Sequence, residues 1–341
     1  KDVPKSETAT DTILAYSASI DVGVTQSYTV EFIYKNDESI DQSEDMGKTL
    51  SGKLFITEGT EGTVTLLSQL LADKSTVLTR TDFSTVLTTN NTKTLYTGVE
   101  DSKTVYYFAG NATDNWVKFG KNASNQDLYW RIIRTNADGS TRMLYHGTST
   151  TATDAYIGTS AFNSSYNNIA YVSYMYGNLG SVANARENTT NSTIKTIIDN
   201  WYKDNLNTNY GKYLSTTAVY CNDRSRPEYY FGAQIRLETN KTPTYDCATT
   251  EDKFTVDTST GNGKLTYPIA LMTADEVSFA GGLYGANTPT WYYYNSANKS
   301  STGSTWWWLL SPYYWFGSYA NVFVVYGSSN PGYLIDNSVG N

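Results

Sequence analysis

The chain has 341 residues, a formal net charge of −8 and only 17% charged residues, with 30 tyrosines and a single histidine. Because binding to phosphates needs clustered Lys and Arg, an acidic chain without a basic run is not expected to bind nucleic acid. One histidine excludes a metal site built from several histidines. The sequence has no run of eighteen apolar residues, so no membrane span is predicted.

The amino-terminal part predicts a small β-rich module followed by a helix. Apolar and polar side chains alternate in 12–16, 28–34 and 53–57, as in half-buried strands, and helical spacing replaces the alternation in 65–74. Residues 77–91 predict a polar connection. The predicted domains are a β-rich module in 1–60, a helical connector in 61–92 and a larger domain in 93–341.

Strands return in the larger domain. Residues 105–108 and 116–119 predict neighbouring strands, and 129–134 and 141–145 predict a hairpin around 136–139. The hairpin signal is strong because Asp-Gly tolerates the positive φ of a tight turn. His146 follows the second of these strands, and we expect it in a solvated loop.

Two helices are predicted next. The first covers 193–206, with Ser192 or Asn191 as its cap and Ile194, Ile197, Ile198, Trp201 and Leu206 on one apolar stripe.

The second predicted helix covers 273–281, where Thr273 and Glu276 match a capping box. Asp275 and Glu276 could form a catalytic pair. Their position in the first turn favours capping instead, because carboxylates are stabilised at the positive end of a helix.

Long irregular stretches, 207–264 and 282–304, lie between and after the helices. Cys221 and Cys247 lie in the first and predict a disulfide in an oxidising compartment; two free buried thiols are the alternative. Calcium could be held by carboxylates of the same stretch, although solvated acids are the favoured interpretation, so we expect no cofactor and no metal. These carboxylates are Asp246, Glu251, Asp252 and Asp257.

The carboxyl-terminal residues 305–337 combine Tyr and Trp with Asn, Ser and Gly, and only Asp336 carries a charge. Stiff aromatic rings with small polar neighbours are typical of recognition surfaces. Because this stretch has no His, Cys, Lys, Arg or carboxylate pair, we expect a binding protein and not an enzyme.

Several segments of the larger domain resemble surface proteins of gut Firmicutes and their prophages. The similar segments are 115–119, 130–139, 156–163, 174–177, 221–225, 266–276 and 307–312. The order of strands, two helices, a long irregular region and an aromatic end is similar to the C-type lectin fold. The resemblance implies an α+β, C-type lectin-like fold of mixed small sheets, two helices and long irregular loops, with the small β-rich module before it.

Some members of this group resemble the variable target proteins of diversity-generating retroelements. That resemblance implies a diversified cassette at about 313–341, with a bulge at Phe323 and with Val322 and Val325 packed inward. The implied ligand-binding residues are Tyr313, Tyr314, Trp315, Tyr319, Asn321, Val324, Tyr326, Asn330, Tyr333, Ile335 and Asn337. Group members usually continue into a closing strand, whereas this chain stops at Asn341, so the tail is trimmed or a strand comes from a neighbour.

The function expected from these observations is an extracellular or cell-surface, adhesin-like or receptor-like protein in a mature or trimmed form. Its partner would be a protein or glycan on another cell or on a phage or host surface, with self-association possible. One alternative is a structural subunit of a surface filament. A remote alternative is an oxidase of the formylglycine-generating type, which shares the lectin-like fold and depends on reactive cysteines.

Overall fold

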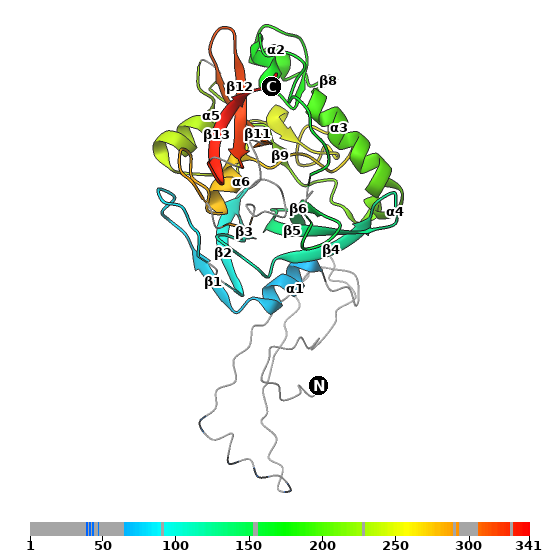
Figure 1. Cartoon of the computed structure of the whole chain (residues 1–341), viewed down its shortest axis with the longest axis vertical. Helices are drawn as coiled ribbons and strands as arrows, with labels where there is room; N and C mark the ends of the chain where they lie inside the picture. Colours follow the sequence, from blue (N-terminus) through cyan, green and yellow to red (C-terminus); the bar gives the residue numbers. More distant parts are fainter. Residues whose placement is uncertain are drawn as a thin grey trace, which may run out of the picture. The chain divides into compact units, whose positions relative to one another are not determined.

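The structure, a computed structural model, describes residues 39, 41, 43, 47, 65–89, 92–152, 156–226, 229–288, 291–292, 306–327 and 330–341. It is an α+β architecture that combines several small sheets with short helices (Figure 1). The chain divides into two compact units, Lys1–Lys74 and Ser75–Asn341, so the division lies before the boundary predicted near residue 92. The strands predicted in 12–16, 28–34 and 53–57 lie outside the described residues.

The first described helix, α1 (Leu66–Asp73), is the one that helical spacing predicts in 65–74. Thr65 caps it: the backbone N–H of Ser68 donates to Thr65 Oγ1 over 3.1 Å. The cap satisfies one of the amides that a helix leaves without a partner at its start.

A six-stranded sheet begins the larger unit. Its strands are β1 (Thr76–Thr79), β2 (Thr94–Glu100), β3 (Lys103–Tyr107), β4 (Trp116–Lys121), β5 (Asp127–Thr135) and β6 (Thr141–Gly147). The order is β1-β2-β3-β5-β4, and β6 also pairs with β5.

Two predictions for this sheet are wrong. β3 and β4 do not pair with each other, because both pair with β5: Tyr107 lies opposite Arg134, and Trp116 lies opposite Arg131. The polar connection predicted in 77–91 is wrong at its start, because Thr76–Thr79 form β1 and run parallel to β2. The sequence Thr-Val-Leu-Thr has no alternation of apolar and polar residues that would have indicated a strand, and all four side chains are exposed.

The β5–β6 hairpin is confirmed. Gly139 has a φ of +83°, and the backbone N–H of Ser140 donates to Asp138 Oδ1 over 2.9 Å. His146 lies within β6 and is 2% exposed, so the expectation of a solvated loop histidine is wrong.

The middle of the chain carries helices with irregular ends. After the 3-10 turn Ile169–Val172 come β7 (Met175–Tyr176), α2 (Val182–Ala185), β8 (Thr190–Asn191), α3 (Thr193–Tyr202), the π-helical segment Lys203–Asn207, α4 (Thr208–Tyr210) and the 3-10 turn Gly211–Tyr213. The predicted cap is confirmed, because Lys195 N–H donates to Ser192 Oγ over 3.2 Å. Ile194, Ile198 and Leu206 are buried on the predicted stripe.

The first long irregular stretch contains more structure than expected. Its elements are β9 (Tyr220–Cys221), α5 (Gly232–Gln234), the π-helical segment Ile235–Asn240, the 3-10 turn Thr250–Asp252 and β10 (Lys253–Phe254). The predicted disulfide between Cys221 and Cys247 is present.

Arg224 is the internal anchor of this stretch and is fully buried. Its guanidinium donates to Asp252, Asn188 and Ser173 and to the backbone carbonyls of Met175, Ala185 and Glu251. One side chain therefore joins four segments of irregular backbone, which compensates for their few regular hydrogen bonds.

Helix α6 (Ala274–Phe279) has the predicted capping box, in which Thr273 and Glu276 each accept from the other's backbone N–H. Glu276 does more than cap. Its carboxylate is 1% exposed and accepts from Arg134 and Arg142, each over 2.9 Å, and Arg134 also pairs with Glu100. Burial raises the pKa of Glu276, but the two arginine charges outweigh it and hold the pKa below its usual range.

The carboxyl-terminal sheet has the order β11 (Trp306–Trp315), β12 (Ala320–Tyr326), β13 (Tyr333–Ser338). The bulge predicted at Phe323 is wrong, because β12 pairs with β13 in unbroken register from Asn321 to Tyr326. The irregularities lie in β11 around Pro312, which has no N–H to donate to a ladder.

Strand β12 is buried on both faces. Val322 and Val324 face a core cluster that includes Phe162, Val172 and Ile198. On the other face, the ring of Phe323 contacts Tyr284 and Tyr313.

In the described part of the chain, none of the helices has the length and hydropathy of a membrane span.

Candidate functional site

The hairpin of β11 and β12 ends in a tight turn at the top of Figure 1. Phe316 N–H donates to the carbonyl of Tyr319 over 3.2 Å, and Gly317 takes a φ of +62°, which favours glycine. Residues 229–231 add to the free edge of β11, where Trp315 N–H donates to the carbonyl of Tyr229 over 2.9 Å. The turn is therefore held on a platform of four extended segments, which are β11, β12, β13 and residues 229–231.

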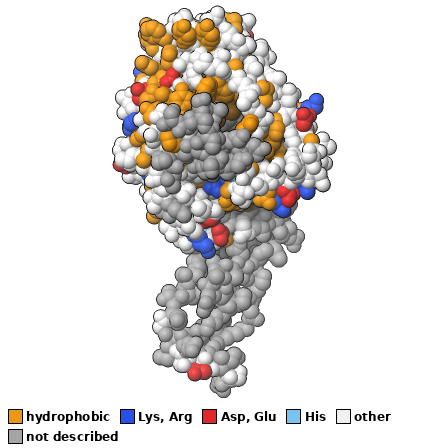
Figure 2. Space-filling model, in the orientation of Figure 1, with side chains coloured by type: hydrophobic (Ala, Val, Ile, Leu, Met, Phe, Trp, Pro, Cys, Tyr) orange, Lys and Arg blue, Asp and Glu red, His pale blue; other side chains and the backbone are white. Residues whose placement is uncertain are grey.

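Exposed aromatic rings gather around this turn, and Figure 2 shows hydrophobic side chains crowded at the same end of the view. We call the five exposed rings the aromatic tip patch: Tyr166 (44% exposed), Tyr229 (60%), Tyr230 (49%), Phe316 (67%) and Tyr319 (51%). Tyr166 and Tyr319 stack with centroids 5.3 Å apart and an angle of 4° between the rings, and Tyr229 and Phe316 lie 5.9 Å apart. Contact between rings limits their rotation, so the patch presents a stiff apolar surface to water.

A buried hydrogen-bonded group supports the patch from below. Tyr313 is 6% exposed, and its hydroxyl donates to Glu238 Oε2 over 2.7 Å while its oxygen lies 2.7 Å from that of Tyr284. The rings of Tyr284 and Tyr313 stack, and Tyr230 meets Tyr313 edge-on. Burial, followed by the bonds to Tyr284 and Glu238, raises the pKa of Tyr313. Burial also raises the pKa of Tyr284, to about 12.

Glu238 lies on the second π-helical segment, where Gln234 also donates to it. The carboxylate of Asp336 belongs to the same side of the sheet: it accepts from Asn321 over 2.7 Å. Burial and then the charge of Glu238 raise the pKa of Asp336. These groups hold one another in place, so the sheet below the patch has few alternative side-chain arrangements.

The predicted site residues fall into three places. Only Tyr319 is in the aromatic tip patch, with Tyr314 and Trp315 half-buried directly behind it. Tyr313, Asn321 and Val324 are buried. A further five are half-buried along β12, β13 and the loop between them: Tyr326, Asn330, Tyr333, Ile335 and Asn337.

The predicted outward face of β12 is a correction. Val324 was expected in the exposed set with Asn321, but it is 0% exposed and lies on the same face as Val322. Asn321 lies on the opposite face, bonded to Asp336. The misplaced bulge at Phe323 produced this error, since one extra residue reverses the face of every side chain after it.

Sequence reasoning missed four members of the patch: Phe316, Tyr229, Tyr230 and Tyr166. Phe316 lies inside the expected cassette but was not singled out. The Tyr229-Tyr230 pair was a usable signal. Adjacent side chains in an extended segment point to opposite faces, so one apolar core cannot bury both rings. No local pattern marks Tyr166, which reaches the turn because Ala320 N–H donates to its carbonyl over 2.8 Å.

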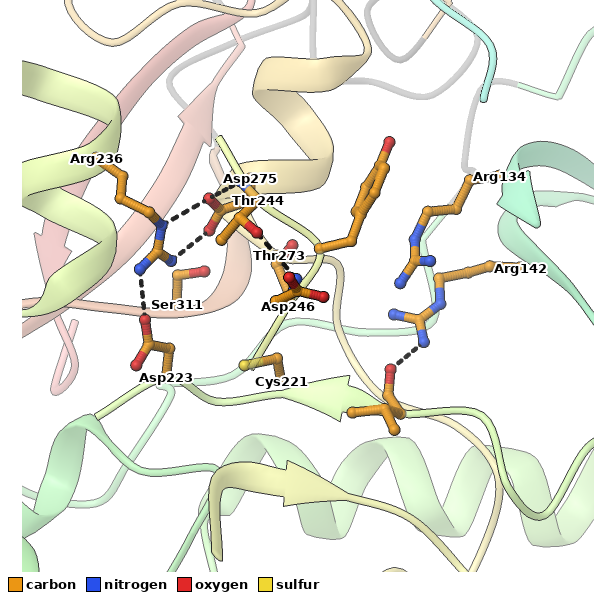
Figure 3. A pocket seen from close by; sticks show the side chains of 12 residues that line it. Arg134, Arg142, Cys221, Asp223, Arg236, Thr244, Asp246, Thr273, Asp275 and Ser311 are labelled. Atoms are coloured by element: carbon orange, nitrogen blue, oxygen red, sulfur yellow. Dashed lines mark hydrogen bonds and ion pairs between the residues drawn. The ribbon is translucent and has the colours of Figure 1, made fainter. Parts of the chain in front are cut away.

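A second cluster of charged side chains surrounds a small cavity beside Cys221 (Figure 3). Arg236 lies on one side and donates to both Asp275 and Asp223, while Arg134 and Arg142 lie across from it. The cavity measures about 10 Å³, which is room for one water molecule. The cluster holds α6 against the rest of the fold and leaves no space for a substrate.

The remaining candidates for chemistry have partners of their own. Both cysteines of the chain are joined in the disulfide, so neither is a thiol in this structure. Among the proposed calcium ligands, Asp252 pairs with Arg224 and Arg186, and Asp246 accepts from the backbone of Asp101. Across the described residues no group of three or more His, Cys, Asp or Glu side chains is placed to hold a metal ion.

No protein-family model matches the chain, no curated protein matches it, and no solved structure matches it. The site is defined by its own geometry, which is a rigid, uncharged aromatic surface on a platform of β-strands.

Proposed function

We propose that this chain is an extracellular ligand-binding protein that contacts a protein or glycan surface through its aromatic tip patch. The observation that carries the proposal is the gathering of five exposed aromatic rings around one hairpin turn. Grouped exposed rings are uncommon on a protein surface without a binding role, and Tyr and Phe supply large contact areas at low entropic cost.

The support beneath the patch favours binding over accidental exposure. The stacked pairs, the Tyr313–Tyr284–Glu238 group and the added segment 229–231 fix the rings before any ligand arrives. A surface that is already ordered loses little conformational freedom when it binds, and this leaves more of the contact energy as affinity.

The finer proposal is a C-type lectin-like scaffold with a diversified carboxyl-terminal cassette. It is supported by the α+β class, by the pairing of β11, β12 and β13, and by the disulfide that closes the long irregular stretch. Phe316 and Tyr319 lie in the proposed cassette, whereas Tyr166, Tyr229 and Tyr230 lie outside it. Sister copies of the gene should then differ at Phe316 and Tyr319 and agree at the other three; uniform copies contradict diversification.

The binding proposal is tested with an array of glycans and cell-surface proteins probed by the wild-type chain and by a Phe316→Ala/Tyr319→Ala variant. Truncation of each true anchor is expected to cost at least about 2 kcal/mol, so the double variant should lose detectable binding. Tyr213→Ala is the matched control, because Tyr213 is an equally exposed ring (66%) outside the patch. If the double variant binds as the wild type does, the ligand site is elsewhere.

A second candidate, a subunit of a surface filament, is favoured by β1. This strand lies at the edge of its sheet in the described part of the chain, and all four of its side chains are exposed, with Val77 at 40% and Leu78 at 45%. Such an edge is a template for strand addition. Concentration-dependent assembly in light scattering that Leu78→Pro abolishes would support it, and a strictly monomeric chain would remove it.

A further inference from the structure

A polar groove lies on a different part of the larger unit, where the β4–β5 hairpin meets the end of the long helix near α4 (Figure 1). Its volume is about 250 Å³. Eight residues line it: Lys121, Asn122, Ala123, Asn125, Asp204, Asn205, Asn209 and Tyr210.

Two backbone irregularities face each other across this groove. On the sheet side, β4 carries an extra residue between Lys118 and Lys121, with Gly120 at a φ of +81°. On the helix side, α3 widens into the π-helical segment Lys203–Asn207. Each feature costs stability relative to regular structure, and both kinds recur beside functional sites.

Gly120 is required for this approach. Its φ of +81° is strained for any other residue, and a Cβ there would lie 2.9 Å from Leu206 Cδ2, so that the Leu206 side chain would also have to shift. The carbonyl freed at the bulge is not lost, because Trp130 Nε1–H donates to Phe119 O over 2.7 Å. The bulge is therefore an ordered feature of the sheet, and its free carbonyl has a hydrogen-bond donor.

The lining divides into groups that hold the groove open and groups that face it. Asn205 accepts from the backbone of Ala123 and donates to Trp201, and Asn122 closes the turn through Ser124 and Gln126. In contrast, the side chains of Asp204, Asn209 and Tyr210 form no hydrogen bond with the described residues. They offer one carboxylate, one amide and one phenol to a ligand.

We propose that this groove binds one ring of a neutral sugar. The Asn209 amide both donates and accepts and the Asp204 carboxylate accepts, which together suit sugar hydroxyls. The Tyr210 ring, held edge-on by Phe119 at 5.7 Å, offers an apolar face to ring C–H groups. The single cation, Lys121, is paired with Asp127 over 3.2 Å, which disfavours an anion. The volume lies below the range of about 300 Å³ and upward for drug-sized ligands, so one ring fits.

The test is saturation-transfer NMR with a panel of neutral hexoses and N-acetylhexosamines, alongside an array that displays the same sugars as terminal residues. A ligand of this size is expected to bind with a Kd of about 1 mM. Binding to the free sugars identifies a monosaccharide ligand, whereas binding only on the array identifies a glycan end.

Asp204→Ala and Asn209→Ala should each raise the Kd for the sugar about 2- to 10-fold, and the double variant should raise it about 4- to 100-fold, with an unchanged melting temperature. Asn207→Ala, an exposed asparagine of the same π-helical segment outside the groove, and Phe316→Ala in the aromatic tip patch should bind as the wild type does. The proposal is overturned if no sugar shows saturable binding in either format, or if the double variant binds as tightly as the wild type. It is equally overturned if Asn207→Ala or Phe316→Ala abolishes the signal, and a loss in Phe316→Ala would assign the sugar to the patch.

Discussion

At the scale of single residues, His146 shows how the fold decides the chemistry of a side chain. It is buried in β6 with its ring 4.5 Å from that of Trp116. Burial, followed by the charge of Arg131, lowers the pKa of His146 to about 4. The imidazole is therefore neutral at physiological pH and packs as an aromatic ring, and a role as an acid-base catalyst near pH 7 is not favoured.

This shift predicts a pH dependence of stability. The unfolded chain takes up a proton at His146 near pH 6.5 and the folded chain only near pH 4, so stability falls as the pH drops from 6.5 to 4. The full loss from this group is about 3 kcal/mol. His146→Phe keeps a ring beside Trp116 and removes the titration. In urea titrations, the unfolding free energy of the wild type should therefore fall by about 3 kcal/mol relative to that of His146→Phe as the pH drops from 6.5 to 4. Carboxylates such as Asp336 titrate in both proteins and cancel in the difference. A constant difference between the two proteins from pH 7 to 4 would contradict the assignment.

Arg224 carries the second prediction at this scale. It is fully buried, and Asp252, its ion-pair partner, is buried with it. Arg224→Met leaves Asp252 with the half-buried Arg186 as its ion-pair partner and with the backbone N–H of residue 224, and the loss of one member of a buried pair costs about 3 to 5 kcal/mol. Arg226→Met, an exposed arginine two residues away, should change the unfolding free energy by less than about 0.5 kcal/mol. Chemical denaturation of both variants measures the contrast, and equal effects would show that Arg224 is not the anchor of this stretch.

At the scale of elements, the parts predicted from sequence are those whose determinants are local. Thr65, Ser192 and Thr273 cap helices through bonds that span three residues, and Asp138-Gly139 closes its turn within itself. The π-helical segments were missed because the patterns used for helices assume the regular period.

The candidate site depends on contacts between residues far apart in the chain, and it was therefore less predictable from the sequence than the caps and the turn. The facing of β12 could not be read from alternation, because different parts of the chain cover its two faces. The unbroken apolar run Val322–Val325 was nevertheless the sign of a strand buried on both sides. The aromatic tip patch needed Tyr166 and Tyr229 to meet residues some 90 to 150 positions later in the chain, and no local pattern records such a meeting.

The hairpin turn itself carries a prediction. Gly317 takes a positive φ with open space around its Cα, so Gly317→Ala meets only backbone strain and should lower the unfolding free energy by about 1 kcal/mol. Gly158 is the matched control: its backbone is not in the left-handed region, and an added Cβ would lie 3.8 Å from Ile197. Gly158→Ala should be neutral or stabilise by up to about 1 kcal/mol. Thermal unfolding that shows the reverse order would mean that the turn is not held as described.

At the scale of the whole molecule, an apolar patch and a net negative charge have opposing effects on self-association. The formal charge of −8 keeps copies of the chain apart near pH 7, and the sequence isoelectric point is about 4.8. As pH falls toward 4.8 the repulsion disappears while the uncharged rings of the patch are unchanged. Light scattering in a buffer of low ionic strength should therefore show association that rises toward pH 4.8 and weakens again when the pH is returned to 7.

The aromatic tip patch should account for much of that association. Phe316→Ser/Tyr319→Ser removes two of the most exposed rings without changing the charge, so this variant should remain more dispersed at pH 4.8 than the wild type. Val99→Ser, which removes a side chain that is 57% exposed on β2, serves as the control and should associate as the wild type does. Because His146 and the carboxylates titrate alike in all three proteins, partial unfolding would affect them equally. Equal association of all three would assign the contact to another surface and leave the patch without a demonstrated affinity for protein.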